Sequence, residues 1–241
     1  MKIITANTYE EMSGQVADDL IRTMQLFNEP LLCPASGSTP VGLYKELVNL
    51  YRQKKFDPSN WLFVALDEWV GMDGNKEGSC KHSLDEQLFN PLKIKADQIC
   101  FFDGKADLDK ECDRVEKFIR QHGGIDVSVL GLGMNGHVGM NEPYTPASLR
   151  SHIAKLDPVT QQVGQKYFKE RQHLSEGVTL GLATLLESKH IFLLVNGERK
   201  AGIVKKVIEG NITEEMPATI LRRHTGLKVY LDADAAQLIQ Q

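Results

Sequence analysis

The sequence predicts an α/β fold: a single doubly wound, Rossmann-like domain over residues 1–241, with a mostly parallel sheet and helices on both faces. Short apolar runs alternate with segments of helical period from one end of the chain to the other. Strands that alternate with helices are typical of βαβ units. With 241 residues, 41% of them hydrophobic, the chain is long enough to bury a substantial core. It contains no linker rich in glycine and serine and no internal repeat.

Six apolar runs have the length and composition of buried strands. They cover residues 2–5, 31–34, 62–66, 126–130, 191–195 and 228–231. Two stripes of apolar residues at helical spacing predict the first helices, comprising Met12, Val16, Leu20, Met24 and Phe27, and then Tyr44, Leu47, Val48 and Tyr51. Further helices are expected at about 79–90, 107–121, 179–187, 199–209 and 217–223.

The segment 143–175 breaks this alternation. It is polar, contains Pro143, Pro146 and Pro158, and has only weak periodicity. Long segments of this kind in compact domains are often lids or binding loops. We therefore expect residues 143–175 to form a lid within the single domain.

Charge and cysteine usage exclude several classes of partner. A net charge of −4 and a pI near 6.0 are not typical of a protein that binds nucleic acid or an acidic membrane surface. No apolar run approaches the ~20 residues of a membrane span, and no apolar signal segment is evident near residue 1. The four cysteines form no C-x-x-C pair, so we expect reduced thiols in a soluble, cytoplasmic protein. The oligomeric state is left open, a homo-oligomer included.

Four loops follow the carboxyl ends of predicted strands, where ligands of open α/β sheets bind. They are 35–40, 67–72, 131–143 and 196–200, and we expect them to meet in one cleft. The first, ASGSTP, is small, rich in hydroxyl groups and followed by a helix. Its backbone N–H groups and side chains suit an anion, and without the lysine of a P-loop it fits a single phosphate better than a nucleotide triphosphate. The alternative is a plain strand-to-helix turn in which Ser38 or Thr39 caps the helix and Pro40 occupies its first turn.

Two adjacent carboxylates, Asp67 and Glu68, come at the end of an apolar strand. Because side chains alternate along a strand, they should point in different directions. One carboxylate can then face the cleft as an acid or base, while the other stabilises the local structure. A helix cap made by both is the alternative.

The run GLGMNGHVGMNEP, residues 131–143, contains a G-x-G-x-x-G after a strand, a pattern typical of a dinucleotide-binding site. The residues after Gly136 include glycine, asparagine and proline and do not make the helix which that fingerprint requires. The glycines instead let the backbone pass close to a ligand. Asn135, His137 and Glu142 then supply a hydrogen-bonding amide, an imidazole and a carboxylate, which favours proton-transfer chemistry near neutral pH.

Three motifs, in order and spacing, carry a family resemblance: ASGSTPVGLY at 35–44, LDEWVGM at 66–72 and GLGMNGHVGMNEP at 131–143, with GVTLGL at 177–182 and NGERKA at 196–201 as weaker matches. The chain resembles the glucosamine-6-phosphate deaminase/isomerase family, and more narrowly its galactosamine-6-phosphate deaminase branch. The resemblance implies isomerisation of an amino-sugar 6-phosphate to a ketose 6-phosphate with hydrolytic loss of ammonia. It implies no cofactor and no metal, and the sequence offers no convincing site for either.

The resemblance also implies a role for each site residue. Asp67 would take the C2 proton and return it to C1, and His137 would assist ring opening with support from Glu142 and Asn135. The substrate phosphate would bind Ser36, Gly37, Ser38 and Thr39, with Lys200 as counter-charge.

Four positions depart from the family pattern. Asn135 replaces an aspartate found in some members, and an amide orients a neighbour but cannot accept a proton as a base. Lys166 falls where the family has a phosphate-binding arginine, so it offers a point charge in place of a fork. His152 and Ala154 occupy the places of basic residues in the activator site of allosteric members, so we expect no activation by an N-acetylated sugar phosphate.

Two other functions stay open on the sequence. A 6-phosphogluconolactonase shares the G-x-G-x-x-G-H core but lacks the Asn141-Glu142-Pro143 ending, and a non-catalytic sugar-phosphate sensor would keep only the phosphate loop. The identity of the sugar, galactosamine or glucosamine phosphate, is also open. The motifs LDEWVGM and GVTLGL favour galactosamine 6-phosphate.

Overall fold

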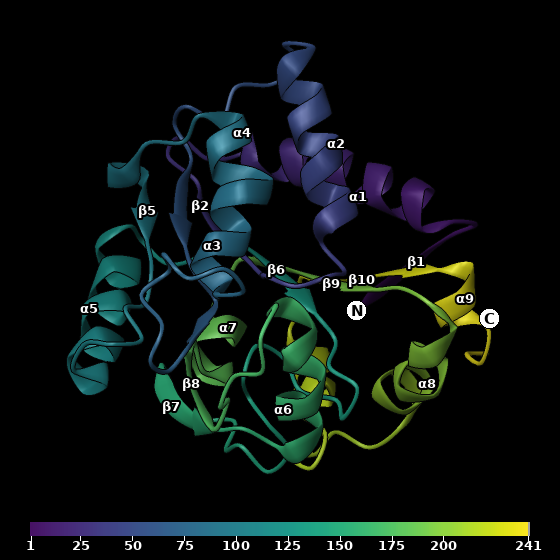
Figure 1. The fold of residues 1–241 in the computed structure, drawn as a ribbon. Helices are drawn as coiled ribbons and strands as arrows, with labels where there is room; N and C mark the ends of the chain where they lie inside the picture. The colour runs from purple at the N-terminus through teal and green to yellow at the C-terminus, as the bar shows by residue number, and fades with distance from the viewer. Residues whose placement is uncertain (241) are drawn as a thin grey trace.

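A seven-stranded parallel sheet forms the centre of the computed structural model, which describes residues 1–240. Its strands lie in the order β1-β10-β9-β6-β2-β3-β5 (Figure 1). Their bounds are β1 Lys2–Ala6, β2 Leu31–Pro34, β3 Leu62–Val64, β5 Ile99–Cys100, β6 Val127–Gly131, β9 His190–Val195 and β10 Leu227–Asp232. All six predicted strands are present, and β5 is an addition that the sequence did not predict.

Helices cover both faces of this sheet, as Figure 1 shows with α1, α2 and α4 above it and α7 and α8 below. The upper layer contains α1 Tyr9–Met24, α2 Val41–Arg52 and a continuous helical stretch made of α3 Cys80–Leu84, the π-helical turn η1 Asp85–Phe89 and α4 Asn90–Leu92. The lower layer contains α5 Leu108–Gln121, α7 Leu182–Leu186, α8 Ala201–Glu209, the 3₁₀ helix η5 Pro217–Arg223 and α9 Ala233–Ala236. The predicted doubly wound α/β architecture is confirmed.

Alternation along each strand explains the continuous apolar runs. On β9, the side chains of Phe192 and Leu194 pack into the core between the sheet and helices α1 and α2. Those of Ile191, Leu193 and Val195 pack into the core on the other face, between the sheet and helices α5 and α8. Both sets are at most 1% exposed. A strand covered on both faces has no polar side to display, so its sequence is apolar throughout.

A second, antiparallel sheet was not predicted. It has the order β4-β8-β7, with β4 Asp67–Trp69, β7 His152–Lys155 and β8 Glu176–Thr179. The prediction that 67–72 is wholly a loop is therefore wrong, and so is a helix beginning at 179, because Thr179 ends β8 and α7 begins at Leu182. These strands have three or four residues with mixed polarity, too short to display a period of two.

The segment 143–175 is more regular than its sequence suggested. It contains β7, the helix α6 Pro158–Gly164 and the 3₁₀ turn η3 Gln165–Tyr167. Asp157 caps α6 by accepting a hydrogen bond from the Val159 N–H, and Pro158 occupies the first helical position. The remaining short turns are η2 Ala96–Gln98 and η4 Glu198–Lys200.

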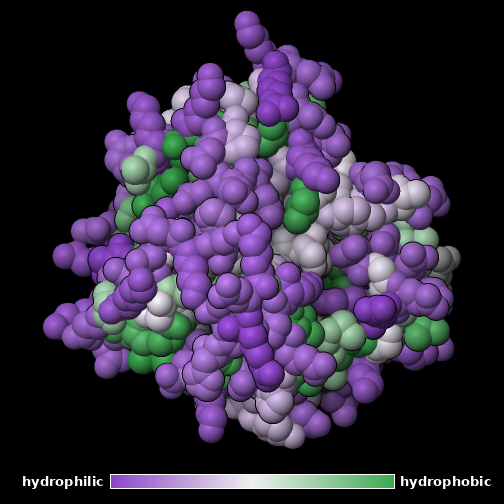
Figure 2. All heavy atoms as spheres, in the orientation of Figure 1, coloured by the Kyte–Doolittle hydropathy of each residue, from purple (hydrophilic) through white to green (hydrophobic). Residues whose placement is uncertain are grey.

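The strand order determines where the four loops meet. Strands β9, β6 and β2 are neighbours and parallel, so the loops after them leave the same edge of the sheet. Strand β3 continues through Ala65 and Leu66 into β4, which brings Asp67 to that edge. The face of the molecule in Figure 2 is mostly hydrophilic with small separate hydrophobic areas. Within residues 1–240, no helix is both long and apolar enough to cross a membrane.

Candidate active site

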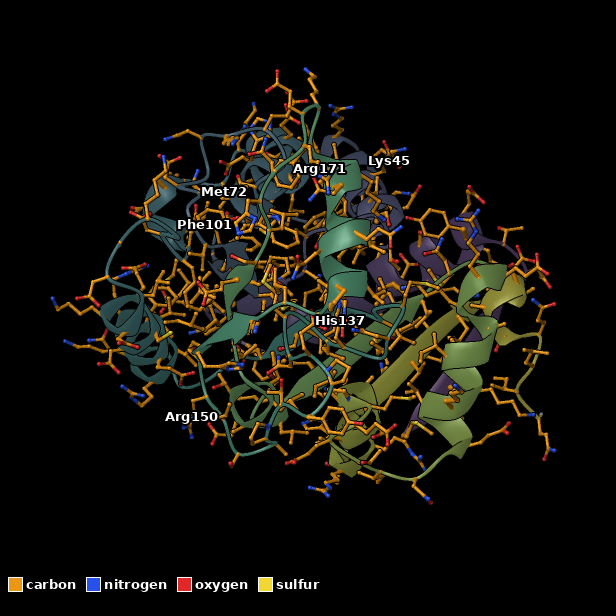
Figure 3. The ribbon with its side chains drawn as sticks, turned by 60° about the horizontal axis from the view of Figure 1, so that its bottom comes forward. Lys45, Met72, Phe101, His137, Arg150 and Arg171 are labelled. Atoms are coloured by element: carbon orange, nitrogen blue, oxygen red, sulfur yellow. The ribbon has the colours of Figure 1, made fainter. Side chains whose placement is uncertain are left out.

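A cavity of about 960 Å³ opens at this edge of the sheet. Residues of all four predicted loops line it, among them Ser36–Thr39, Asp67, Gly131–Met134 with His137, and Asn196–Lys200. Residues 159–167 of the segment 143–175 complete the wall. In Figure 3, His137 lies near the middle of the molecule and Arg150 at its periphery. The expectation that the four loops converge on one cleft is confirmed.

Asp67 stands at the start of β4 with its side chain at the cavity. The residue is only 8% exposed, and this burial raises the pKa of its carboxyl to about 6, although a hydrogen bond from Cys80 and the charge of His137 act in the other direction. A carboxyl group with a pKa near 6 is ionised at neutral pH and is still a stronger base than a solvated carboxylate.

Glu68 serves a different purpose. Its carboxylate accepts hydrogen bonds from the backbone N–H groups of Trp69 (2.8 Å), Cys80 (3.0 Å) and Lys81 (3.0 Å). Burial raises the pKa of this carboxyl to about 7 in spite of those three bonds. The adjacent carboxylates therefore point in different directions, as alternation along a strand predicts: Asp67 lines the cavity, and Glu68 joins β4 to the start of α3.

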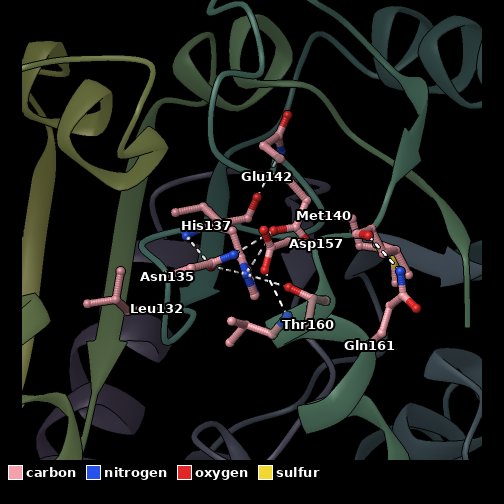
Figure 4. A network of polar contacts seen from close by, with 12 residues as sticks. Leu132, Asn135, His137, Met140, Glu142, Asp157, Thr160 and Gln161 are labelled. Atoms are coloured by element: carbon pink, nitrogen blue, oxygen red, sulfur yellow. Dashed lines mark hydrogen bonds and ion pairs between the residues drawn. The ribbon is translucent and has the colours of Figure 1, made fainter.

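His137 is held through its Nδ1 atom (Figure 4). The Asn135 Oδ1 atom lies 2.6 Å from Nδ1, Thr160 Oγ1 3.1 Å and Glu142 Oε2 3.5 Å. Asn135 Nδ2 donates to Glu142 Oε2 at 2.8 Å. Sequence reasoning brought these three loop residues together correctly. The carboxylate lies beside the imidazole, and the Asn135 amide forms a hydrogen bond with each of them.

This arrangement determines the tautomer of the imidazole. An ionised carboxylate only accepts, so the amide nitrogen of Asn135 faces Glu142 and its oxygen faces His137. Nδ1, facing oxygen atoms, therefore carries a proton, and in the neutral ring Nε2 has a free lone pair. Burial of Glu142 would raise the pKa of its carboxyl, but the hydrogen bond and charge of His137 lower it overall, with contributions from Thr160 and Asn135.

The glycine spacing of this loop has a steric cause. A Cβ atom on Gly133 would lie 2.3 Å from Cε1 of the His137 ring, and real Cβ atoms do not approach that closely. Gly136 has a φ of +85°, a conformation that side chains disfavour. Glycine at 133 therefore makes room for the imidazole, and glycine at 136 turns the chain towards it.

The loop 36–39 carries the predicted phosphate-binding groups. Gly37 has a φ of +106°, and α2 begins after Pro40 without any side-chain cap, so the alternative in which Ser38 or Thr39 caps the helix is wrong. Two tyrosine hydroxyls hold the carbonyl groups at the ends of the loop: Tyr44 donates to Ala35 O (2.5 Å) and Tyr9 to Thr39 O (2.7 Å). The Tyr9 oxygen also accepts from the Gly42 N–H at 2.7 Å.

Two lysines supply positive charge beside this loop. Lys166 Nζ donates to Ser38 Oγ at 3.2 Å, so the predicted residue does reach the loop. Lys200 Nζ donates to the Leu132 carbonyl and also lines the cavity. Burial, and then the charge of Lys166, lower the pKa of Lys200 to about 8. An anion between the two ammonium groups would relieve both effects.

Sequence reasoning missed Thr160, Tyr9 and Tyr44. The two tyrosines belong to apolar helical stripes or their edges, and Thr160 lies in a segment of weak periodicity, so no local pattern distinguishes them. Spatial proximity to the loops is the only signal. In the described part of the chain, no three His, Cys, Asp or Glu side chains are grouped as they would be around a metal ion.

Known proteins resemble the chain over nearly its full length. Residues 7–230 match the family described as glucosamine-6-phosphate isomerases/6-phosphogluconolactonase. A glucosamine-6-phosphate deaminase of Geobacillus sp. (strain WCH70) is 37% identical, covering 99% of this chain and 96% of that protein. The counterpart of the same name in Oceanobacillus iheyensis is 37% identical, covering 98% and 96%.

Solved structures agree. A monomeric glucosamine-6-phosphate deaminase, described as a missing link of the NagB superfamily, superposes with a TM-score of 0.96 at 34% identity, covering 99% of this chain and all of the other. A 6-phosphogluconolactonase from Thermotoga maritima has a TM-score of 0.78 at 19% identity, covering 96% and 98%, and so shares the fold. The chain belongs to the glucosamine-6-phosphate isomerase/6-phosphogluconolactonase family.

Proposed function

We propose that the chain converts an amino-sugar 6-phosphate and water into a ketose 6-phosphate and ammonia. The observation that carries this proposal is the convergence of a buried carboxylate, an oriented imidazole and a phosphate-type loop with two lysines on one cavity. The names of the relatives favour glucosamine 6-phosphate over the galactosamine 6-phosphate towards which the motifs lean.

The phosphate is the anchor of the substrate. Backbone N–H groups and hydroxyls of Ser36–Thr39 suit its oxygen atoms, and Lys200 and Lys166 supply the opposing charge. Holding one end of the sugar in this way places C1 and C2 among the other polar groups that line the cavity, which include Asp67 and His137. Fixed geometry of this kind converts substrate binding into rate acceleration.

His137 opens the sugar ring. Its Nε2 lone pair accepts the proton of the anomeric O1 hydroxyl, and the imidazolium so formed gives that proton to the ring oxygen as the C1–O5 bond breaks. The Nδ1 proton remains shared with Asn135 Oδ1, so the imidazolium that forms is stabilised by the neighbouring Glu142 carboxylate. The product of this step is the open-chain amino aldehyde.

Asp67 then moves one proton between adjacent carbons. Its carboxylate removes the C2 proton, the electron pair forms the C1–C2 double bond, and O1 gains a proton from the ammonium group at C2, which gives a neutral enolamine. Return of the proton from Asp67 to C1 leaves a C2 iminium ion. Water adds to C2, the C–N bond breaks, and ammonia leaves with the ketose 6-phosphate as the second product.

We further propose that residues 143–175 act as a lid on a single domain. Lys166 contacts Ser38, and the Tyr167 hydroxyl lies 3.1 Å from the place a Cβ on Gly37 would occupy. The turn η3 therefore lies directly over the phosphate loop. A cover in this place would exclude water while the enolamine exists.

The first test is ammonia release from glucosamine 6-phosphate and galactosamine 6-phosphate, measured side by side. Ammonia from the wild type, lost in Asp67→Asn and retained in the exposed control Asp97→Asn, supports the proposal. The two other functions predict different results. A lactonase would hydrolyse 6-phosphogluconolactone without releasing ammonia, and a sensor would bind a sugar phosphate and turn over neither compound.

A further inference from the structure

The Thr160 hydroxyl is a second hydrogen-bonding partner of the His137 imidazole, after the Asn135 amide. No sequence motif identifies it. Thr160 lies on α6, is 7% exposed, and places Oγ1 3.1 Å from His137 Nδ1. Its hydroxyl also contributes to lowering the pKa of the Glu142 carboxyl. Figure 4 shows Thr160 on the side of the ring opposite the Gly-rich loop that carries His137 and Asn135.

Nδ1 of His137 lies within hydrogen-bond distance of two oxygen atoms, Asn135 Oδ1 and Thr160 Oγ1. Nδ1 donates, so the Thr160 oxygen accepts from it, and the Thr160 proton is free to point at the Glu142 carboxylate. Glu142 Oε2 itself is 3.5 Å from Nδ1, beyond the usual length of a hydrogen bond. Glu142 therefore acts on the imidazole by its charge and through the Asn135 amide, and the Thr160 hydroxyl is a second hydrogen-bonding partner of Nδ1.

These two hydrogen-bonding partners of Nδ1 come from different parts of the chain. Asn135 is two residues from His137 and moves with the same loop. Thr160 belongs to α6, whose position is set by the Asp157 cap and by Pro158. Its neighbours Val159, Gln162 and Val163 line the cavity. A contact between substrate and α6 is thus transmitted to the ring by a single hydrogen bond.

We propose that Thr160 is a positioning residue for His137: its hydroxyl holds the imidazole with Nδ1 protonated and Nε2 towards the cavity, and it couples the ring to α6. This inference rests on the proposed function for its effect on catalysis. The orientation of the ring is a property of the free protein and does not depend on that function.

The experiment compares Thr160→Val, which has the same shape without the hydroxyl, with Thr160→Ser, which keeps the hydroxyl. Thr184→Val is the matched control, because Thr184 is also buried and also donates to a carboxylate, that of Glu116, away from the cavity. Loss of one hydrogen bond to the ring should lower kcat roughly ten-fold in Thr160→Val with little change in KM. Thr160→Ser should recover most of the wild-type kcat, and Thr184→Val should match the wild type.

The second readout is the ¹⁵N spectrum of the histidine rings in the protein without substrate, with His137→Gln identifying the resonances of His137. The wild type should show one tautomer, protonated at Nδ1. In Thr160→Val the two ring nitrogens should move towards each other as the ring samples both tautomers. Thr184→Val should leave them unchanged.

Two results would overturn the proposal: an unchanged His137 spectrum with unchanged kcat in Thr160→Val, or equal losses in Thr160→Val and Thr160→Ser, which would assign the effect to packing of the methyl group. Should Thr160→Val fail to fold, Thr160→Cys keeps the volume with a weaker hydrogen-bonding group and is judged by the same criteria. Absence of ammonia release from the wild type would defeat the proposed function alone, because the spectrum still tests the ring.

Discussion

Asp67 and Glu68 are consecutive residues of one short strand, yet their carboxylates have opposite surroundings. Asp67 lines the cavity, whereas Glu68 is 1% exposed and accepts three backbone hydrogen bonds. Burial raises the pKa of both groups, to about 6 and about 7. The strand thus presents to the cavity the carboxylate that we propose as the base, beside a carboxylate that fastens the strand to α3.

The first prediction concerns the decrease of kcat/KM at acidic pH. Asp67 must be ionised to accept a proton, and its pKa lies at about 6 because the group is buried. We expect kcat/KM to fall as pH decreases through about 6, in place of the lower value of a solvated aspartate. Steady-state rates across this range check it. A flat profile down to pH near 4 would show that Asp67 is not the base.

The second prediction concerns stability. Below the unfolded pKa of 3.8, Asp67 is protonated in both states and contributes nothing; as pH rises to about 6 only the unfolded state ionises, so the free energy of unfolding falls. Above that range the cost is on the order of 3 kcal/mol. Asp67→Asn should therefore be inactive but more stable than the wild type at neutral pH, and nearly equal to it in acid. Urea unfolding at the two pH values, with Asp97→Asn as the control, measures the difference.

The third prediction concerns the phosphate. Removing a charged hydrogen-bonding group costs about 1.5–3 kcal/mol, so Lys200→Ala should raise KM roughly 10- to 100-fold with a smaller change in kcat. Lys205→Ala is the matched control, since Lys205 lies on α8 and pairs with Glu209. The pKa of Lys200, lowered to about 8 by burial, also predicts that KM rises as pH exceeds 8 and the ammonium group loses its proton. If the Lys200→Ala enzyme shows the same rise in KM above pH 8, the rise does not come from Lys200 and the prediction is contradicted.

The fourth prediction concerns the support of the phosphate loop. The Tyr9 hydroxyl bonds both Thr39 O and the Gly42 N–H, so Tyr9→Phe removes two contacts that hold the loop. We expect KM to rise about 3- to 10-fold and kcat to stay within about two-fold, because in the proposed function the loop binds the phosphate and takes no part in proton transfer. Tyr51→Phe, in a ring that packs against Phe56 near the other end of α2, should behave as wild type. Equal effects of the two substitutions would exclude a specific role for Tyr9.

The fifth prediction is that an N-acetylated sugar phosphate does not activate the protein. A shallow pocket of about 260 Å³ contains His152, Ala154 and Lys155. Burial lowers the pKa of His152, which is therefore uncharged at neutral pH, and Ala154 has no charge. Rates measured at low substrate with and without N-acetylglucosamine 6-phosphate should coincide. A change from a sigmoidal to a hyperbolic rate curve would refute the prediction.

The sequence predicted the large sheet well, because long apolar runs of four to six residues report burial on both faces. It did not predict β4, β7 and β8, whose residues include Asp67, His152 and Glu176. Pairing of β4 with β8 joins residues far apart in the sequence, such as Asp67 and Thr179. No local pattern reports a contact at that separation. The single domain and its lid stay predictions.

The sequence by itself determined the α/β class, the four loops at one edge of the sheet and the chemical groups available there, since strand periodicity and glycine spacing are local properties. Tertiary structure alone decided the hydrogen bonds that make those groups reactive. It placed the Asn135 amide between His137 and Glu142, brought Thr160 from a distant helix to the same ring, and buried Asp67 so that its pKa rises. Desolvation and hydrogen bonding depend on neighbours in space, and only the folded chain assembles them.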